Sequence, residues 1–77
     1  MLVIAIKENN QRYKLSLRCS PEFVKAHSTG MGKVIEQLVM RFGGRGGGHD
    51  LAGGWNVSTG DYVQFKDHPS AIDEIIG

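Results

Sequence analysis

The segment "MGKVIEQLVMRF", residues 31–42, runs directly into "GGRGGGHD", residues 43–50, and this junction decides the fold. Apolar residues recur in the first segment at the spacing of an amphipathic helix with one buried face. Arg41 lies in the last turn, and two glycines follow, as is typical of a helix C-terminus. The sequence predicts a helix over 31–42 whose apolar stripe consists of Met31, Val34, Ile35, Leu38, Val39 and Phe42.

Two strands are predicted upstream of this helix. Residues 2–8 are apolar on both faces, and residues 12–19 alternate between apolar and polar side chains. Asn9-Asn10-Gln11 tolerates turn geometry, so the two strands are expected to form a hairpin. One face of the second strand carries Tyr13, Leu15, Leu17 and Cys19, and the other carries Lys14, Ser16 and Arg18.

Shorter elements are predicted around these. Ser20-Pro21 is a typical helix start, with serine as the cap and proline in the first turn. Downstream, residues 54–58 and 62–66 are expected as short strands about a turn at Thr59-Gly60-Asp61. Residues 69–76 are expected as a final short helix.

The amino-acid composition limits the classes of protein to which this chain can belong. The chain has 77 residues, of which 40% are hydrophobic and 22% charged, as in an ordinary soluble domain. No apolar run approaches the roughly 20 residues of a membrane span, and no signal peptide is recognisable. The lone Cys19 permits no internal disulfide, which favours the cytoplasm. We expect a single α/β domain over residues 1–77, with a small mixed sheet of about four to five strands flanked by helices.

Charge is distributed unevenly along the chain. The formal net charge is +1, yet residues 1–45 carry eight Lys or Arg against three Glu, and residues 46–77 carry one Lys against five acids. The first part is therefore +5 and the second −4. Such an asymmetry allows anion binding on one face, although a scattered, solvated surface is the alternative.

The glycine segment fails the nucleotide-binding motifs. Gly43 to Gly48 has Walker spacing, but His49-Asp50 replaces Lys-Ser/Thr and the segment follows a helix. The dinucleotide fingerprint would need glycine at His49. What remains is an expected nest, in which inward-turned amides from Gly46 to His49 seat a phosphate while Arg45 either grips a second phosphate oxygen or stacks on a base. The alternative is a flexible connector or hinge.

Three stretches carry a family resemblance: "GGRGGGHDLAGG" at 43–54, "LSLRCS" at 15–20, and the amphipathic segment before the glycines. Together they resemble the DHH-associated domain in its GGGH-motif subtype, over about residues 3–76. That domain is the C-terminal substrate-binding part of DHH-family phosphoesterases, including RecJ-like single-strand exonucleases, and a relative occurs in alanyl-tRNA synthetase. The resemblance implies a mixed sheet flanked by helices.

The resemblance also implies a site. Gly46, Gly47, Gly48 and His49 would hold the phosphate backbone of single-stranded nucleic acid or an oligonucleotide against a separate DHH catalytic domain in the parent chain. Arg18 and Ser16 match the family's short Ser-x-Arg strand motif and are expected to contact the backbone as well. Arg45 interrupts the glycine run, and Gly53 stands where the family often has alanine. The parent enzyme would use Mn²⁺ or Mg²⁺, with no cofactor in this chain.

No catalytic constellation is present in the sequence. The aspartates are isolated, and His27, His49 and His68 lack the short spacing of metal ligands. We therefore expect a binding module without catalysis of its own. Trp55 is expected either to stack on a base or to fill the core. Two further hypotheses remain: the substrate domain of a small-phosphodiester phosphodiesterase acting on oligonucleotides or cyclic dinucleotides, and a protein interaction module with a glycine hinge.

Overall fold

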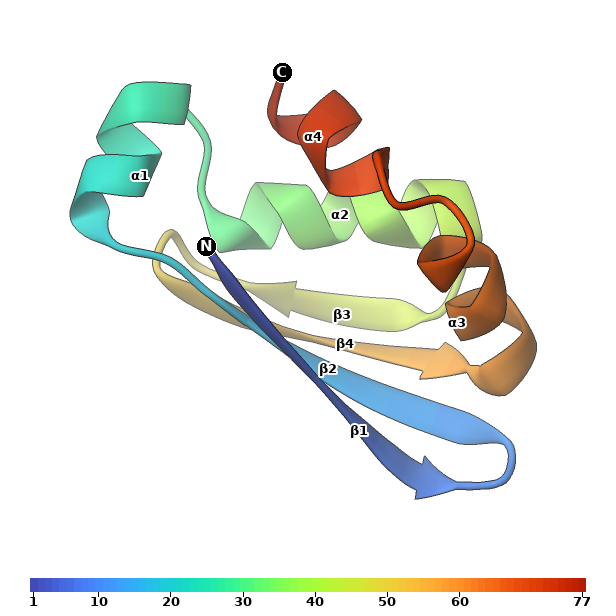
Figure 1. Ribbon diagram of the computed structural model, residues 1–77. Helices are drawn as coiled ribbons and strands as arrows, with labels where there is room; N and C mark the ends of the chain where they lie inside the picture. Colours follow the sequence, from blue (N-terminus) through green and yellow to red (C-terminus); the bar gives the residue numbers. More distant parts are fainter.

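Two β-hairpins form one sheet in the order β1-β2-β4-β3 (Figure 1). A computed structural model describes all residues, 1–77, and confirms a single α/β domain with four strands and four helices. We expected a mixed sheet, but every strand pair is antiparallel. Tight turns join β1 to β2 and β3 to β4, and such turns connect only antiparallel strands. The elements in chain order are β1 (Leu2–Asn9), β2 (Arg12–Arg18), α1 (Pro21–His27), α2 (Met31–Phe42), β3 (Arg45–Gly48), β4 (Ala52–Ser58), α3 (Thr59–Lys66) and α4 (Ala71–Ile76).

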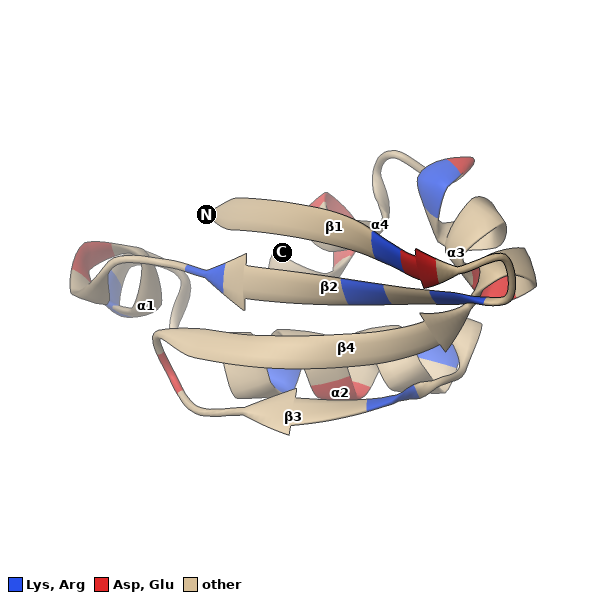
Figure 2. Ribbon diagram, turned by 90° about the horizontal axis from the view of Figure 1, so that it is seen from below, with Lys and Arg blue, Asp and Glu red and all other residues tan.

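Helix α2 covers one face of the sheet, and the prediction of its boundaries is confirmed. Its apolar stripe meets the inward-facing side chains of β2 and β4 in a core that excludes water. All helices lie on this side or at the ends of the sheet, and the opposite face is bare (Figures 1 and 2). The core consists of Leu15, Leu17, Met31, Val34, Ile35, Leu38, Trp55 and Val57.

The glycine segment is a strand, not the expected loop. Gly43 and Gly44 have φ angles of 99° and 86°, which turn the chain sharply after α2. The chain then extends as β3 and pairs with β4, which begins at Ala52, two residues before the predicted start at residue 54. Glycine is a poor strand former in isolation, and here pairing with β4 determines the conformation.

Residues 62–66, predicted as a strand, belong to helix α3. The Ser58 hydroxyl accepts a hydrogen bond from the Asp61 amide at 3.2 Å, which caps this helix at its start. Tyr62 stacks on Tyr13 with ring centroids 4.0 Å apart, and Phe65 meets Trp55 edge-on at 5.2 Å. In this segment the spacing of the apolar residues resembles that of a short strand. In the structure the two aromatic residues, Tyr62 and Phe65, instead pack from a short helix against the sheet.

The remaining helices are held by caps and one ion-pair network. The Ser20 hydroxyl caps α1, as predicted, by accepting from the Phe23 amide at 3.2 Å. Helix α4 is attached to α2 by Glu74, whose carboxylate lies 2.6 Å from Arg41 and 3.1 Å from His68. The longest helix, α2, has 12 residues. None of the helices combines the length and the apolar character that crossing a membrane requires.

Candidate nucleic-acid interface

Strand alternation divides the glycines of the two C-terminal strands between the faces of the sheet. Trp55 of β4 points into the core, so its neighbour Gly54 and the residue paired with it, Gly47, belong to the opposite face. Gly46 is paired with Trp55 and Gly48 with Gly53, which places these glycines on the side of α2. The GGGH motif therefore does not present one surface.

The glycines beneath α2 allow the helix to pack closely. A Cβ at Gly46 would lie 2.8 Å from Ile35 Cγ2, and a Cβ at Gly53 would clash with Ile35 Cδ1. The helix has a matching glycine, because a Cβ at Gly32 would lie 2.7 Å from the carbonyl oxygen of Gly48. These positions lack side chains because backbone and helix meet there.

The expected nest of converging amides is absent, so that prediction is wrong. The amide of His49 donates to the carbonyl oxygen of Ala52 at 3.0 Å. Hydrogen-bonded and non-hydrogen-bonded pairs alternate along an antiparallel ladder, so the Gly47 amide also faces β4, while those of Gly46 and Gly48 point to the free edge. Amides that alternate in direction cannot surround one anion.

The helix-free face provides a different arrangement. His49, Ala52 and Arg18 lie in one row across β3, β4 and β2, because Ala52 pairs with Arg18 and bonds to His49. We call these three residues the anion row. The next row consists of Gly47, Gly54 and Ser16, which are cross-strand partners. We call it the glycine floor, since a serine hydroxymethyl group is its largest side chain.

The basic side chains of this face have no partners within the protein. The ion pairs of the structure are Arg41–Glu74 and His68–Glu74, and neither involves this surface. No side-chain hydrogen bond uses Arg18 or His49, and both residues are exposed. Blue bands along β2 and at the start of β3 show where the Lys and Arg residues lie along these strands (Figure 2), and the strand register assigns them to this face. Their donors are free to meet a ligand anion.

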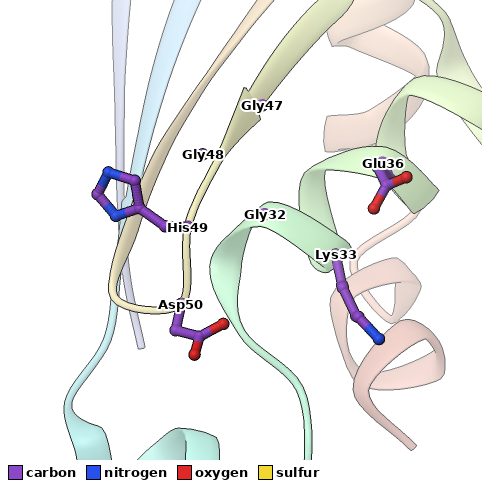
Figure 3. A pocket seen from close by; sticks show the side chains of 7 residues that line it. All are labelled: Gly32, Lys33, Glu36, Gly47, Gly48, His49 and Asp50. Atoms are coloured by element: carbon purple, nitrogen blue, oxygen red, sulfur yellow. The ribbon is translucent and has the colours of Figure 1, made fainter.

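A pocket on the other side of β3 is less suited to an anion. It has a volume of about 260 Å³ and lies between the first turns of α2 and the edge of β3 (Figure 3). The α2 amides of Met31 and Gly32 already donate to the carbonyl oxygens of Asp50 and His49, at 2.9 and 3.0 Å. Glu36 and Asp50 offset the charge of Lys33, and the ring of His49 points away from the helix.

The structure brings together only part of the predicted site. Ser16, Arg18, Gly47 and His49 share the helix-free face in two adjacent rows. Arg45 is on the same face but at the other end of β3, opposite Asn56. The side-chain positions of Gly46 and Gly48 lie on the α2 side, away from these residues.

Trp55 is not available for base stacking. Its side chain is fully buried, and its indole Nε1 donates to the carbonyl oxygen of Gly43 at 2.9 Å. Of the two expectations for this residue, the structure selects the core position. The sequence carried a signal for this outcome, because Trp55 and Val57 alternate with polar or small residues along one strand.

Two residues of the face were missed at the sequence level. Gly54 completes the glycine floor, and Asn56 lies between Lys14 and Arg45. The alternation of residues 52–58 about Trp55 was the signal that could have found both. No group of three or more His, Cys, Asp or Glu side chains in the structure could hold a metal ion.

Comparison with known proteins gives one distant relative, and no family model matches the chain. The relative is an uncharacterized protein of Methanocaldococcus jannaschii, 31% identical over 75 residues. The match covers 96% of this chain but 21% of the relative. The chain thus spans about a fifth of the length of the protein it resembles.

Proposed function

We propose that this domain binds the phosphate backbone of single-stranded nucleic acid or an oligonucleotide through the helix-free face of its sheet. The observation that carries the proposal is the anion row, where Arg18 and His49 are exposed and unpartnered on either side of Ala52. Arginine and histidine supply directed donors for phosphate oxygens. The adjoining glycine floor leaves room for a backbone to approach the sheet.

We further propose that the domain serves a larger phosphoesterase as its substrate-binding part. The resemblance to the DHH-associated domain supports this role, as does a relative about five times the length of the match. In this proposal a DHH domain holds Mn²⁺ or Mg²⁺ and performs hydrolysis in the cytoplasm. The present chain contributes binding and orientation of the strand.

Nuclear magnetic resonance titration with short oligothymidylates tests the binding site. We expect amide shifts at Gly47, Gly54 and His49 and at Arg18, and none on α1. Arg18→Ala should weaken binding about tenfold, since a hydrogen bond to a charged group contributes about 1.5–3 kcal/mol. Lys25→Ala is the matched control, because it removes one positive charge from α1 and should leave affinity unchanged.

His49→Ala should weaken binding alongside Arg18→Ala, whereas His27→Ala on α1 should not. If both Arg18→Ala and His49→Ala bind like the parent protein, the site assignment is wrong. Shifts confined to the pocket between α2 and β3 would also contradict it and would move the site to the opposite side of β3.

A second candidate function, protein interaction, is supported by β1. This edge strand pairs only with β2 and leaves Leu2, Ile4 and Ile6 exposed by 55%, 48% and 56%. Exposed apolar edge strands are common protein contacts. Concentration-dependent dimerisation in sedimentation, unaffected by oligonucleotide, would favour this function over nucleic-acid binding.

A further inference from the structure

A second cationic group lies at the other end of the helix-free face. Lys14 and Arg45 flank Asn56 in one row across β2, β4 and β3, and Arg12 of β2 lies opposite Ser58 in the next row. We call Arg12, Lys14 and Arg45 the distal cluster. Arg12 and Arg45 line a hollow of about 430 Å³ together with Glu8 and Asn56. None of the three basic side chains has an ion-pair partner.

The separation of the two cationic groups sets a minimum ligand size. Lys14 lies four residues from Arg18 along β2, which corresponds to about 13 Å of extended strand. One phosphate is too small to contact both groups. A stacked nucleic-acid strand advances roughly 3.4 Å per nucleotide, so this distance corresponds to about four nucleotides, or fewer when the strand is stretched.

The surface between the two groups is open to a polymer. The glycine floor lies there, and a Cβ at Gly47 would meet no heavy atom within 4 Å. The alternation of each strand assigns Arg12, Lys14, Arg18 and Arg45 to this face, and Glu8 lines the distal hollow together with Arg12 and Arg45. A positive track therefore follows β2, and no acidic residue lies in the rows from Arg18 to Lys14.

An apolar strip runs beside this track. Leu2, Ile4 and Ile6 of β1 pair in register with Arg18, Ser16 and Lys14, so they face the same side of the sheet. Single-stranded nucleic acid has a charged backbone on one side and flat apolar bases on the other, which matches a cationic track next to an apolar strip. The rings of Tyr13 and Trp55 face the core, so this face offers apolar contact without aromatic stacking.

We infer that the ligand is a single strand of about four nucleotides or more, whose phosphates follow β2 from the anion row to the distal cluster and whose bases cover Leu2, Ile4 and Ile6. This inference rests on the proposed function and narrows its substrate class to oligomers. A dinucleotide reaches only one of the two cationic groups. Contacts to backbone and apolar base surfaces carry no hydrogen-bond code, so binding is tolerant of sequence.

The test measures affinity against strand length with the full 77-residue chain. Oligothymidylates should bind more tightly as they lengthen from two to about four nucleotides, with a total gain of at least tenfold, and then level off. The Lys14→Ala/Arg45→Ala variant should lose this gain and bind the dinucleotide like the parent protein. Its plot of log affinity against log salt, measured with the longer strand, should be shallower by about 1.4, since each lost phosphate contact contributes about 0.7.

Two matched controls complete the test. Lys25→Ala/Lys66→Ala removes the same charge from α1 and α3 and should keep the length dependence. Ile4→Ser should weaken the binding of oligothymidylate but not of inorganic polyphosphate, which has no bases.

The outcomes separate the inference from the proposed function. Equal affinity for the dinucleotide and for longer strands, with Arg18→Ala still harmful, overturns the inference and leaves the phosphate site in place. If polyphosphate and oligothymidylate respond equally to Ile4→Ser, the assignment of bases to β1 is wrong. No binding at any length, with no effect of Arg18→Ala, overturns the proposed function itself.

Discussion

Strands β3 and β4 have glycines on both faces of the sheet, and the surroundings of the glycines on the α2 side differ from those of the glycines on the helix-free face. A Cβ at Gly46 would lie 2.8 Å from Ile35 and even closer to the carbonyl oxygen of Gly54, whereas a Cβ at Gly47 would meet nothing within 4 Å. On one face, glycine is required because a helix packs against the strand. On the other face a side chain at Gly47 would meet no steric obstacle, so packing does not require glycine there.

The largest expected effect is on the helix side. Gly46→Ala should lower the free energy of unfolding by about 1–3 kcal/mol, because the added methyl group overpacks the contact with Ile35. For a domain of this size the melting temperature falls by roughly 4–8 °C per kcal/mol. Thermal unfolding followed by circular dichroism provides the measurement. An unchanged melting temperature would show that α2 does not pack as closely as the structure indicates.

The next effect concerns binding on the bare face. Gly47→Val should weaken oligonucleotide binding about tenfold without loss of stability, because the branched side chain fills the glycine floor and its Cβ meets no heavy atom within 4 Å. Gly60→Val on α3 is the comparison variant, since that position is equally open and lies outside the glycine floor. Fluorescence anisotropy with a labelled oligonucleotide reports the affinity. Equal binding by both variants would mean that no ligand approaches the floor.

A smaller effect of opposite sign is expected from Gly47→Ala. Alanine reduces the entropy of the unfolded chain, and Gly47 does not have a positive φ, so stability should rise by about 0.4–1 kcal/mol. Urea unfolding of the two single variants, Gly47→Ala and Gly46→Ala, should show changes of opposite sign in the free energy of unfolding. If both variants are destabilised, the division of the glycines between the two faces fails.

The smallest effect is electrostatic and lies away from both glycine sets. Hydrogen bonds from Arg41, His68 and Ser70 lower the pKa of Glu74 from 4.5 to about 2. The lowered pKa stabilises the fold above pH 4.5, and this contribution is lost as the pH falls from about 4.5 toward 2. Glu74→Gln should therefore flatten the acid side of the stability curve. Melting temperatures at pH 7 and pH 3 should differ less in the variant than in the parent protein; an equal difference would mean that the ion pairs contribute no stability.

Much of the fold was predictable because the strongest signals are local. The stripe of α2 repeats at helical spacing, and each of Met31, Val34, Ile35 and Leu38 is buried as predicted. Residues 62–66 were misread because a five-residue segment satisfies both a strand and a helix pattern. There the deciding contacts, Tyr62 with Tyr13 and Phe65 with Trp55, come from distant parts of the chain.

For the candidate site, the residue types were predicted but their arrangement was not. Arg18, Ser16 and His49 were identified, and they lie on one face. The glycines were expected to curl around an anion, because backbone freedom is all that a glycine run reveals by itself. Pairing with β4 extends this run instead, and extension sends alternate residues to opposite sides of the sheet.

The sequence alone determined the amphipathic helix, the first hairpin and the basic face of β2, since each depends on the period of side chains along one segment. Only the tertiary structure decided which glycines support α2 and which remain open. It also decided that Trp55 is buried and that Lys14 and Arg45 form one row. The turns fix the register within each hairpin, but the pairing of β2 with β4 joins segments about 40 residues apart, and no turn between them specifies it.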